Sequence, residues 1–445
     1  MVVRPWARGR VAVAIAAAAA VLAACSPDTS WVDANDSAVW PGMGGNGHNS
    51  SYADLNAAKT LVPAWTRPLG GTNLAPPSIT NRGYTSVTAK TPSGCTTFML
   101  EITVGRKVYC RRDGVGVELQ TPLVDQFDYS YMGNPGWVIS PDSANQIRWR
   151  RPVSGDPLWL KFGGARELLV VTHIGQVLVL DTHSGEPLGP SYGLVPNKTV
   201  TDNADGLGDC PDAGPGCPVS APPAVDTARS RAYVVVRRDG AKRSDLVAFD
   251  YGKVNGLNTI RIAWERTDID DDPWGSPVLS ADSRTLYVNT RGGKLLAVDA
   301  DGGKTKWSYD TGYSTKLAPS VSPSGDIVLA AGATSRAPLI GLHDDGGSAR
   351  ELFRRTDVAN VSVPAQVRGG TGYTVVRDWG GGNTKLIEFR TDSGDTTRTF
   401  DLPGTVKSTS GVAIGPGGEL VTVSDSGDVY AFTSGKKIGD GIRAD

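Results

Sequence analysis

The chain has few of the residues on which catalysis and metal binding usually depend. It has five cysteines and four histidines in 445 residues. No two cysteines are adjacent. The histidines stand on different segments without metal-ligand spacing: His48, His173, His183 and His343. We therefore predict a protein that is not an enzyme, with no catalytic residues, no metal and no cofactor.

An excess of charge of one sign is also missing. The chain has 45 basic and 46 acidic residues, and the lysines and arginines are spread along it without forming a basic stripe. Proteins that bind nucleic acid usually concentrate positive charge on one face or segment. We expect no nucleic-acid partner.

Long apolar runs are absent except for one near the N-terminus. Three arginines precede the run Val11–Leu22, and the sequence Leu22-Ala23-Ala24-Cys25 follows it. This pattern is typical of a bacterial lipoprotein signal, and the run is too short to remain as a membrane span. We predict a signal peptide at 1–24, lipidation of Cys25 and a flexible leader over 25–59. The alternative is an ordinary cleaved signal. Either way the chain is extracytoplasmic, and lipidation would anchor it to the cell membrane, facing the periplasm.

What the sequence does contain is a repeat. Eight times an apolar strand runs into a polar or glycine-bearing turn, and in the clearest copies a Trp follows, as in Leu295–Asp299, Gly302-Gly303 and Trp307. The eight strands end at Ile102, Pro141, Asp181, Asp250, Asp299, His343, Arg390 and Thr433. Periods of roughly 40 to 50 residues with several short strands each are typical of propeller blades.

The fold class predicted from these repeats is all-β. We expect an eight-bladed β-propeller of four-stranded antiparallel blades, with seven blades as the alternative. The last copy, Asp428–Phe432, has no outer strand of its own, whereas Leu61–Arg67 has the outer-strand pattern with Trp65. We predict that this N-terminal strand closes the ring, which removes two sheet edges. The propeller is expected to be a single domain over 60–436, followed by a tail at 437–445.

These repeats resemble the quinoprotein-type, PQQ-like propeller repeat, in which an apolar strand ends in Ala-Leu-Asp before a Thr-Gly-Lys-like turn and a Trp. Trp40-Pro41-Gly42, followed by Asn46 and His48, also resembles that family's lead-in segment. The resemblance implies the fold rather than one function. Some members are quinone-dependent dehydrogenases that hold the cofactor with an adjacent-Cys disulfide, a Trp and calcium; others are cofactor-free scaffolds, including an envelope lipoprotein of outer-membrane protein assembly.

The remaining cysteines form two candidate pairs. Cys95 is expected on the third strand of the first blade, opposite Cys110, and Cys210 and Cys217 close a short loop rich in Gly and Pro. An oxidising compartment favours two disulfides. Free buried thiols and metal ligation are the alternatives.

Two further patterns have ordinary explanations beside functional ones. Residues 42–47 match the dinucleotide fingerprint by letters, but no strand precedes them and no helix follows, so we interpret them as leader. Asp268, Asp270, Asp271 and Asp272 could bind calcium, although such a run is more often a solvated turn.

One face of the propeller is expected to carry the partner-binding residues. The connections from each outer strand to the next inner strand, and from second to third strand, emerge together there. The predicted set is Trp159, Trp274, Trp379, Arg237, Arg238, Lys242 and Arg243. Exposed Trp and Arg favour interface centres; the alternative is that the Trp rings pack between blades and the charges are solvated.

The function that the sequence favours is a protein-interaction scaffold, anchored by lipid, in a cell-envelope assembly, secretion or transport complex. A membrane protein complex would be its partner. One alternative is a receptor for a small molecule or glycan at the tunnel mouth. Another is a PQQ-dependent oxidoreductase, which the absence of adjacent cysteines disfavours.

Overall fold

The structure is a computed structural model that describes residues 39–435 except 73–74, 93, 113–119 and 333–336. The predicted signal peptide, the lipidation site Cys25 and the tail at 437–445 lie outside the described residues. The chain divides into two compact units, and all described residues belong to the second, Ala34–Asp445.

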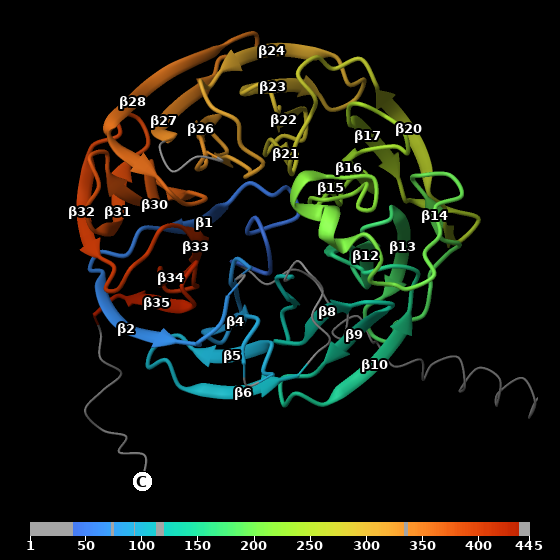
Figure 1. The fold of residues 1–445 in the computed structure, drawn as a ribbon, viewed down its shortest axis with the longest axis horizontal. Coiled ribbons are helices and arrows are strands. Elements are labelled where there is room, and N and C mark those ends of the chain that lie inside the picture. Colours follow the sequence, from blue (N-terminus) through green and yellow to red (C-terminus); the bar gives the residue numbers. More distant parts are fainter. Residues whose placement is uncertain (1–38, 73–74, 93, 113–119, 333–336, 436–445) are drawn as a thin grey trace, which may run out of the picture. The chain divides into compact units, whose positions relative to one another are not determined.

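Short antiparallel sheets surround a common centre in this unit (Figure 1). Among the described residues, six sheets have four strands each, named here from the innermost strand outward. They are β3 (Ser78–Ile79), β4 (Tyr84–Thr88), β5 (Thr97–Glu101) and β6 (Lys107–Arg111); β7 (Leu123–Val124), β8 (Ser130–Asn134), β9 (Trp137–Pro141) and β10 (Ile147–Pro152); β11 (Trp159–Gly164), β12 (Glu167–Val171), β13 (Gln176–Asp181) and β14 (Tyr192–Gly193); β15 (Ala224–Asp226), β16 (Arg231–Val236), β17 (Asp245–Asp250) and β20 (Arg261–Arg266); β21 (Val278–Leu279), β22 (Thr285–Asn289), β23 (Lys294–Asp299) and β24 (Thr305–Asp310); and β33 (Thr409–Ile414), β34 (Leu420–Ser424), β35 (Asp428–Thr433) and β2 (Val62–Pro68).

A nine-stranded sheet contains the other main strands. Two antiparallel sets of four merge in it because the end of the long strand β28 pairs with β30, and β1 (Tyr52–Asn56) adds in parallel to β29. The sets are β25 (Ser320–Val321), β26 (Asp326–Val328), β27 (Ala337–Asp344) and β28 (Ala349–Asn360), and β29 (Ala365–Arg368), β30 (Thr371–Asp378), β31 (Thr384–Arg390) and β32 (Thr396–Asp401). The eight-blade count stays a prediction, with seven as its alternative.

The predicted closing strand is confirmed. β2 pairs antiparallel with β35 in a register that runs from Val62 opposite Thr433 to Pro68 opposite Asp428. Each third strand also ends within one residue of the position that the repeat predicts. Trp264 stands farther from the end of its third strand, Asp250, than Trp307 does from Asp299, because a hairpin of β18 (Lys253–Val254) and β19 (Leu257–Asn258) is inserted before its strand, β20.

The core lies between neighbouring sheets, because the middle strands bury side chains on both faces. Leu168, Leu169, Val170 and Val171 of β12 are all fully buried. Aromatic rings fill the junctions: Tyr131 of β8 contacts Trp149 of β10 and Phe162 of β11. Such units bury their apolar faces only against one another, which is why the repeats must stack.

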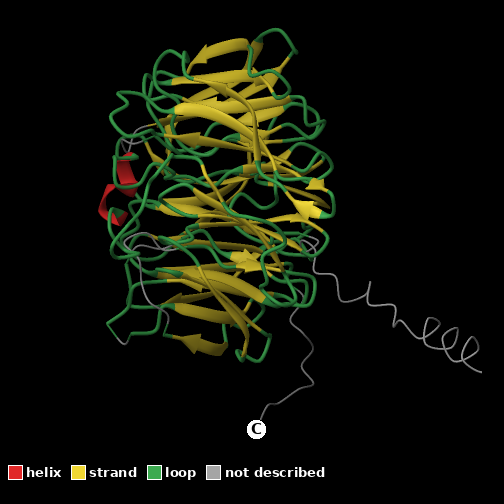
Figure 2. Ribbon diagram, turned by 90° about the vertical axis from the view of Figure 1, so that its right-hand side faces the viewer, coloured by secondary structure: helices red, strands yellow, loops and turns green. Residues whose placement is uncertain are grey.

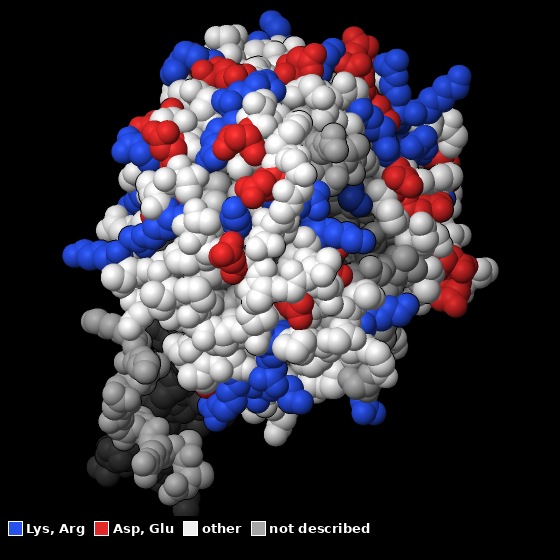
Figure 3. All heavy atoms as spheres, turned by 60° about the vertical axis from the view of Figure 1, so that its left-hand side comes forward, with Lys and Arg blue, Asp and Glu red and all other residues white. Residues whose placement is uncertain are grey.

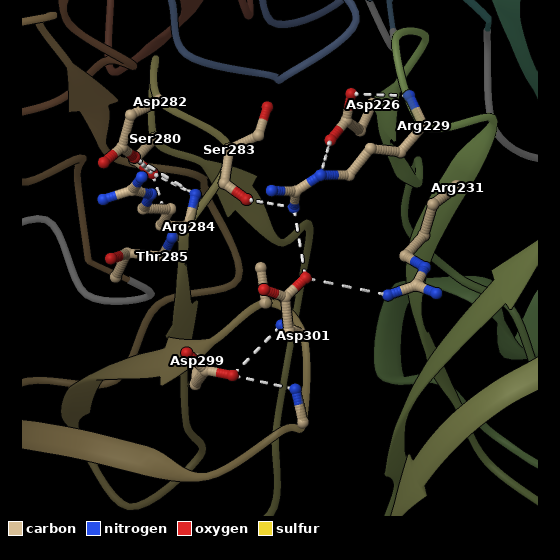
Figure 4. A network of polar contacts seen from close by, with 12 residues as sticks. Asp226, Arg229, Arg231, Ser280, Asp282, Ser283, Arg284, Thr285, Asp299 and Asp301 are labelled. Carbon is tan, nitrogen blue, oxygen red and sulfur yellow. Dashed lines mark hydrogen bonds and ion pairs between the residues drawn. The ribbon is translucent and has the colours of Figure 1, made fainter.

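Polar side chains join neighbouring sheets at their turns. Arg229, which follows β15, donates from Nη1 to the carbonyl oxygen of Ser283, 2.9 Å away, and pairs with Asp301 at 3.2 Å (Figure 4). Arg231 approaches the same carboxylate at 3.9 Å. This network connects the turns of two sheets on the face opposite the site described below.

The one helical element among the described residues is the 3₁₀ helix η2 (Leu207–Asp212). It lies at one face of the ring (Figure 2). No helix in the described part of the chain is long and apolar enough to cross a membrane.

Candidate functional site: the channel mouth

The N-terminal segment fills the centre of the ring. Carbonyl oxygens of residues 40–51 accept hydrogen bonds of 2.8–3.0 Å from the backbone N–H groups of successive innermost strands. The pairs, donor first, are Ile79 with Trp40, Val124 with Pro41, Val225 with Gly47, Leu279 with His48, Val321 with Ser50 and Gln366 with Ser51. We call residues 40–52 the plug, because they contact the strands in turn and lie inside the ring (Figure 1).

Two side chains, those of Lys161 and Asn49, hold the plug in place through hydrogen bonds. Lys161 of β11 is 4% exposed and donates from Nζ to the carbonyl oxygens of Met43 and Asn46, at 2.8 and 2.9 Å. Asn49 donates from Nδ2 to the carbonyl oxygens of Pro223 and Pro277, both at 3.0 Å. The structure thus differs from the expected flexible leader, because backbone groups of its second half, through residue 56, are paired with the ring.

A cavity of about 240 Å³ lies above the plug. Its walls are the small and apolar residues that open the innermost strands, its floor is the plug, and Trp159 lies at its side. The lining residues include Trp40, Met43, Asn49, Ala75, Pro76, Pro77, Trp159, Ala221, Pro222, Leu317, Ala318, Val363, Val412 and Ala413. Ligand pockets are usually concave and mostly apolar in this way.

The cavity has little charge to offer a ligand. Lys316 is the one ionisable residue in its lining, and its ammonium group donates to the carbonyl oxygen of Pro211 at 3.1 Å. The indole Nε1 of Trp159 is also engaged, by the carbonyl oxygen of Val219 at 3.1 Å. A neutral, mainly apolar group therefore fits this cavity best.

Residues 207–217, which we call the flap, lie on the same face as the cavity. The flap contains η2 and is closed by the Cys210–Cys217 disulfide. Four cationic side chains donate to its backbone carbonyl oxygens: Lys316 to Pro211, Arg291 to Asp212, Arg237 to Ala213 and Lys198 to Pro215. Backbone carbonyls carry partial negative charge, so these bonds hold the flap against several sheets at once.

The predicted basic loop lies between β16 and β17, and its members differ in what they bind. Arg237 holds the flap, and Arg238 is fixed by Asp245, by Glu265 and by the carbonyl oxygen of Leu194. Arg243 pairs with Asp270 at 3.5 Å. Lys242 is exposed. Arg237 and Arg238 are therefore structural, and Lys242 is the residue of this loop that is most available to a partner.

The predicted Trp residues are not brought into one cluster. Trp159 lies beside the cavity, and Trp274 packs under the guanidinium of Arg291 at 4.5 Å with its indole N–H buried and without a hydrogen-bond partner among the described residues. Trp379 is 37% exposed in the loop between β30 and β31. Trp274 precedes the innermost strand β21 and Trp379 lies in a loop that joins second and third strands, whereas Trp159 is the first residue of the innermost strand β11.

The acidic run before β21 does not gather into a cation site. Each carboxylate has a cationic neighbour: Asp268 has Arg266, Asp270 has Arg243, Asp271 has Lys294 and Asp272 has Arg291. Within the described residues no group of three or more His, Cys, Asp or Glu could hold a metal ion. Ion pairs with the protein's own cations thus explain why these four aspartates stand together in the sequence.

A buried pair supports the connection into β11. His173 Nδ1 accepts a hydrogen bond from the backbone N–H of Asp156, so its Nε2 carries the proton and donates to the carbonyl oxygen of Asp205. Burial lowers the pKa of His173 and raises the pKa of Asp156 to about 7. The imidazole meets the backbone of Asp156 rather than its carboxylate, so the two do not form an acid–base couple.

Both predicted disulfides are present. Cys95 is bonded to Cys110 and Cys210 to Cys217, with Cα atoms 5.8 and 5.0 Å apart. The placement of Cys95 was wrong in detail: it precedes β5, and Cys110 lies opposite Phe98, because the turn is centred one residue later than that pairing requires and the β5–β6 ladder contains a bulge. A bulge shifts register by one residue and cannot be recognised from strand spacing alone.

The residues at the channel mouth do not fit a pyrroloquinoline quinone. That cofactor carries carboxylates, whereas the cavity lining has one cation, which is already bonded to the flap. The plug also occupies the ring centre below the cavity. The plug was not predicted from the sequence. The resemblance of Trp40 and His48 to the family's lead-in segment was the signal that could have indicated it.

Comparison with known proteins finds relatives over nearly the whole chain. A family model described as outer membrane protein assembly factor BamB matches residues 228–433. Protein Rv3035 of Mycobacterium tuberculosis is 36% identical over 412 residues, which are 92% of this chain and 99% of that protein.

Solved structures with the same architecture are more distant in sequence. BamB from Moraxella catarrhalis matches with a TM-score of 0.54 and 16% identity, over 84% of this chain and 99% of that one. The quinohemoprotein alcohol dehydrogenase ADHIIG from Pseudomonas putida HK5 matches with a TM-score of 0.60 and 12% identity, over 92% of this chain and 82% of that one. At such identities the likeness supports the β-propeller fold alone.

Proposed function

The chain belongs to the PQQ-like β-propeller repeat family, and from this premise we propose that it is a non-enzymatic, lipid-anchored scaffold outside the cytoplasm. It would serve a cell-envelope assembly, secretion or transport complex whose membrane protein it binds. Lipidation of Cys25 would hold it near such partners. The family contains both scaffolds and dehydrogenases, so the two functions have to be distinguished by the residues of the site.

The observation that carries this proposal is the plug. It ties the innermost strands to one segment and leaves a shallow apolar cavity beneath a rigid face instead of an open catalytic channel. The flap, Trp379 and Lys242 lie on that face. Aromatic and cationic side chains on rigid loops suit an interface centre, because they bury large areas with little loss of rotamer freedom.

The test is crosslinking of the native lipoprotein in its own membranes, followed by capture and mass spectrometry. We expect one reproducible membrane protein complex, and weaker capture by W379A/K242A. The matched control is W137A, which removes a Trp that is 40% exposed on β9. Equal capture by both variants contradicts the proposed face, and recovery of the protein alone contradicts the scaffold.

The cavity itself favours a second candidate function, a receptor for a small neutral molecule. Its apolar walls and Trp159 would enclose part of such a ligand. A thermal-shift screen of neutral aromatic compounds and glycans tests this directly. A ligand that raises the melting temperature of the native protein but not of A318F, in which a ring fills the cavity, would support the receptor. A scaffold would keep its crosslinked partner in the native protein and in A318F alike.

A further inference from the structure

Two outer strands, β2 and the two-residue β14, expose no charged side chain, and β2 is the longer of them. The outer strands β6, β10, β20, β24, β28 and β32 each expose at least one charged side chain, for example Lys107 of β6 and Arg150 of β10. β2 exposes Val62, Pro63, Ala64, Thr66 and Pro68 and no charged side chain, and its single arginine is half-buried. The strand that closes the ring thus presents an uncharged outer edge.

A turn of the neighbouring sheet extends this edge. Trp65 of β2 donates from Nε1 to the carbonyl oxygen of Ile102, and Arg67 donates from Nη1 to that of Gly105, both at 2.6 Å. These bonds hold the β5–β6 turn against β2, with Val104 between the two acceptors and 62% exposed. We call Val62, Pro63, Ala64 and Val104 the β2 rim; Val62 is 42% exposed.

The rim is unsuited to pairing with another strand. Pro63 and Pro68 lack backbone N–H groups, and prolines on an edge strand block the addition of a further strand. This argues against a second copy of the chain or an extended peptide that adds to β2. A smooth apolar surface that needs no directional hydrogen bonds is a better match.

The charges beside the rim indicate which surface that is. Lys59 and Lys107 flank it; both are exposed, and neither forms an ion pair within the described residues. The described chain also ends here, since a Cβ atom on Gly435 would lie 3.6 Å from Val62 and Thr60 donates to the carbonyl oxygen of Ser434.

We propose that the β2 rim rests on a bilayer surface that contains anionic lipids. Exposed aliphatic side chains flanked by lysines combine apolar burial at the headgroup boundary with attraction to anionic headgroups. Figure 3 shows the side of the ring that faces left in Figure 1: charges of both signs crowd its upper part, whereas in its lower part Lys and Arg side chains lie among an otherwise white surface with few acidic side chains. This contact goes beyond the lipid anchor, and it leaves the channel mouth free for a partner.

The contact is tested without the anchor, so that its failure is distinct from failure of the scaffold. The full chain with Cys25→Ser is mixed with vesicles of phosphatidylcholine, alone or with phosphatidylglycerol, and sedimented. We expect binding to the anionic vesicles that falls about tenfold in V62D/V104D and in K59E/K107E. The matched control is V254D, which places the same charge at a valine that is 52% exposed on β18.

A second measurement covers the case in which an aspartate variant misfolds. In the Cys25→Ser chain the other four cysteines are in disulfides, so V104C offers a single thiol for an environment-sensitive fluorophore. A blue shift on anionic vesicles supports the proposal, and V254C should show none. No vesicle binding by the parent chain, equal loss in V254D, or no shift at V104C overturns it. Loss of a crosslinked membrane protein in V62D/V104D with vesicle binding intact also overturns it, because the rim would then be a protein interface.

Discussion

The indole Nε1 of Trp264 donates a hydrogen bond to the carbonyl oxygen of Ala300, 3.0 Å away. Trp264 lies on β20 and Ala300 follows β23, so the bond joins the outer strand of one sheet to the third strand of the next. Gly303, in the turn of that next sheet, lies under the indole with a φ of 72°. A Cβ atom there would come within 2.9 Å of the ring.

The same contact recurs at two other junctions. Trp65 donates to Ile102 and Trp149 to Thr182, and Gly105 and Gly185 lie under their rings with positive φ. The Trp and the turn glycine of the repeat are therefore two halves of one contact between neighbouring repeats. This explains why they recur together in the sequence.

Replacing Gly303 with alanine should destabilise the propeller. The left-handed conformation costs about 1–2 kcal/mol for a residue with a Cβ, and displacement of the Trp264 ring adds about 1–3 kcal/mol. The midpoint of denaturant unfolding checks this. The control is Gly256→Ala in the β18–β19 hairpin, where φ is 83° and nothing lies within 4 Å of the added atom. Equal loss in both variants would show that the contact with Trp264 contributes nothing.

Most of the fold was predictable because a propeller repeats one local pattern. Leu295–Asp299, Gly303 and Trp307 carry the strand, the turn and the ring contact in a single short segment, and closure through Leu61–Arg67 follows from a copy that lacks its outer strand. The plug was not predictable in the same way. Its bonds join residues 40–51 to strands up to 315 positions away, through backbone groups that leave no side-chain pattern.

The candidate site was predictable only in part, for a related reason. A loop rich in arginine and lysine has the same sequence pattern whether its cations face solvent or bind acceptors within the protein. Arg237 and Arg238 bind the flap and two carboxylates that lie elsewhere in the sequence, whereas Lys242 in the same loop is exposed. Only the folded structure, in which the insertion before β15 packs against this loop, distinguishes the two bonded arginines from the exposed lysine.

Lys161→Met should loosen the plug. The ammonium group satisfies the carbonyl oxygens of Met43 and Asn46, and its loss leaves two partly buried acceptors without that donor, at a cost of about 1–3 kcal/mol. Limited proteolysis should then cut within residues 40–52 faster than in the parent chain. Lys304→Met, at an exposed lysine, is the control. Unchanged cleavage in Lys161→Met would mean that the backbone bonds alone hold the plug.

Stability should fall as pH rises toward neutrality because of Asp156. Burial raises its pKa to about 7, above the value of about 4 expected in the unfolded chain. Between these values the folded state holds a proton that the unfolded state has released, so raising the pH through this window favours unfolding. In Asp156→Asn this part of the pH dependence should disappear, measured as the melting temperature at pH 5 and pH 8.

The control for this titration is Asp401→Asn, which removes an exposed carboxylate at the end of β32. It should keep the full pH dependence of the parent chain. A parent chain whose melting temperature is flat between pH 5 and pH 8, or an Asp156→Asn variant that retains the slope, would show that Asp156 is ionised in the folded state despite its burial.

The Cys210–Cys217 disulfide should order the flap without supporting the ring. It closes a loop of seven positions that contacts the sheets through cations bonded to its carbonyl oxygens and through a small apolar cluster with Leu158 and Trp159. Removing a crosslink restores chain entropy to the opened loop, so hydrogen exchange in residues 207–217 should quicken by about tenfold or more in C210S/C217S. The melting temperature should change little, because the apolar residues of the flap form a small cluster separate from the larger cores between sheets.

The other disulfide provides the comparison that makes this result specific. Cys95–Cys110 ties the segment before β5 to β6, inside a sheet, so C95S/C110S should lower the melting temperature and leave exchange in the flap unchanged. If C210S/C217S also weakens capture of the membrane partner while the ring stays folded, the ordered flap belongs to the docking face. Faster exchange with full capture would place docking at the cavity rim and Trp379, and unchanged exchange would show that the four cations suffice to hold the flap.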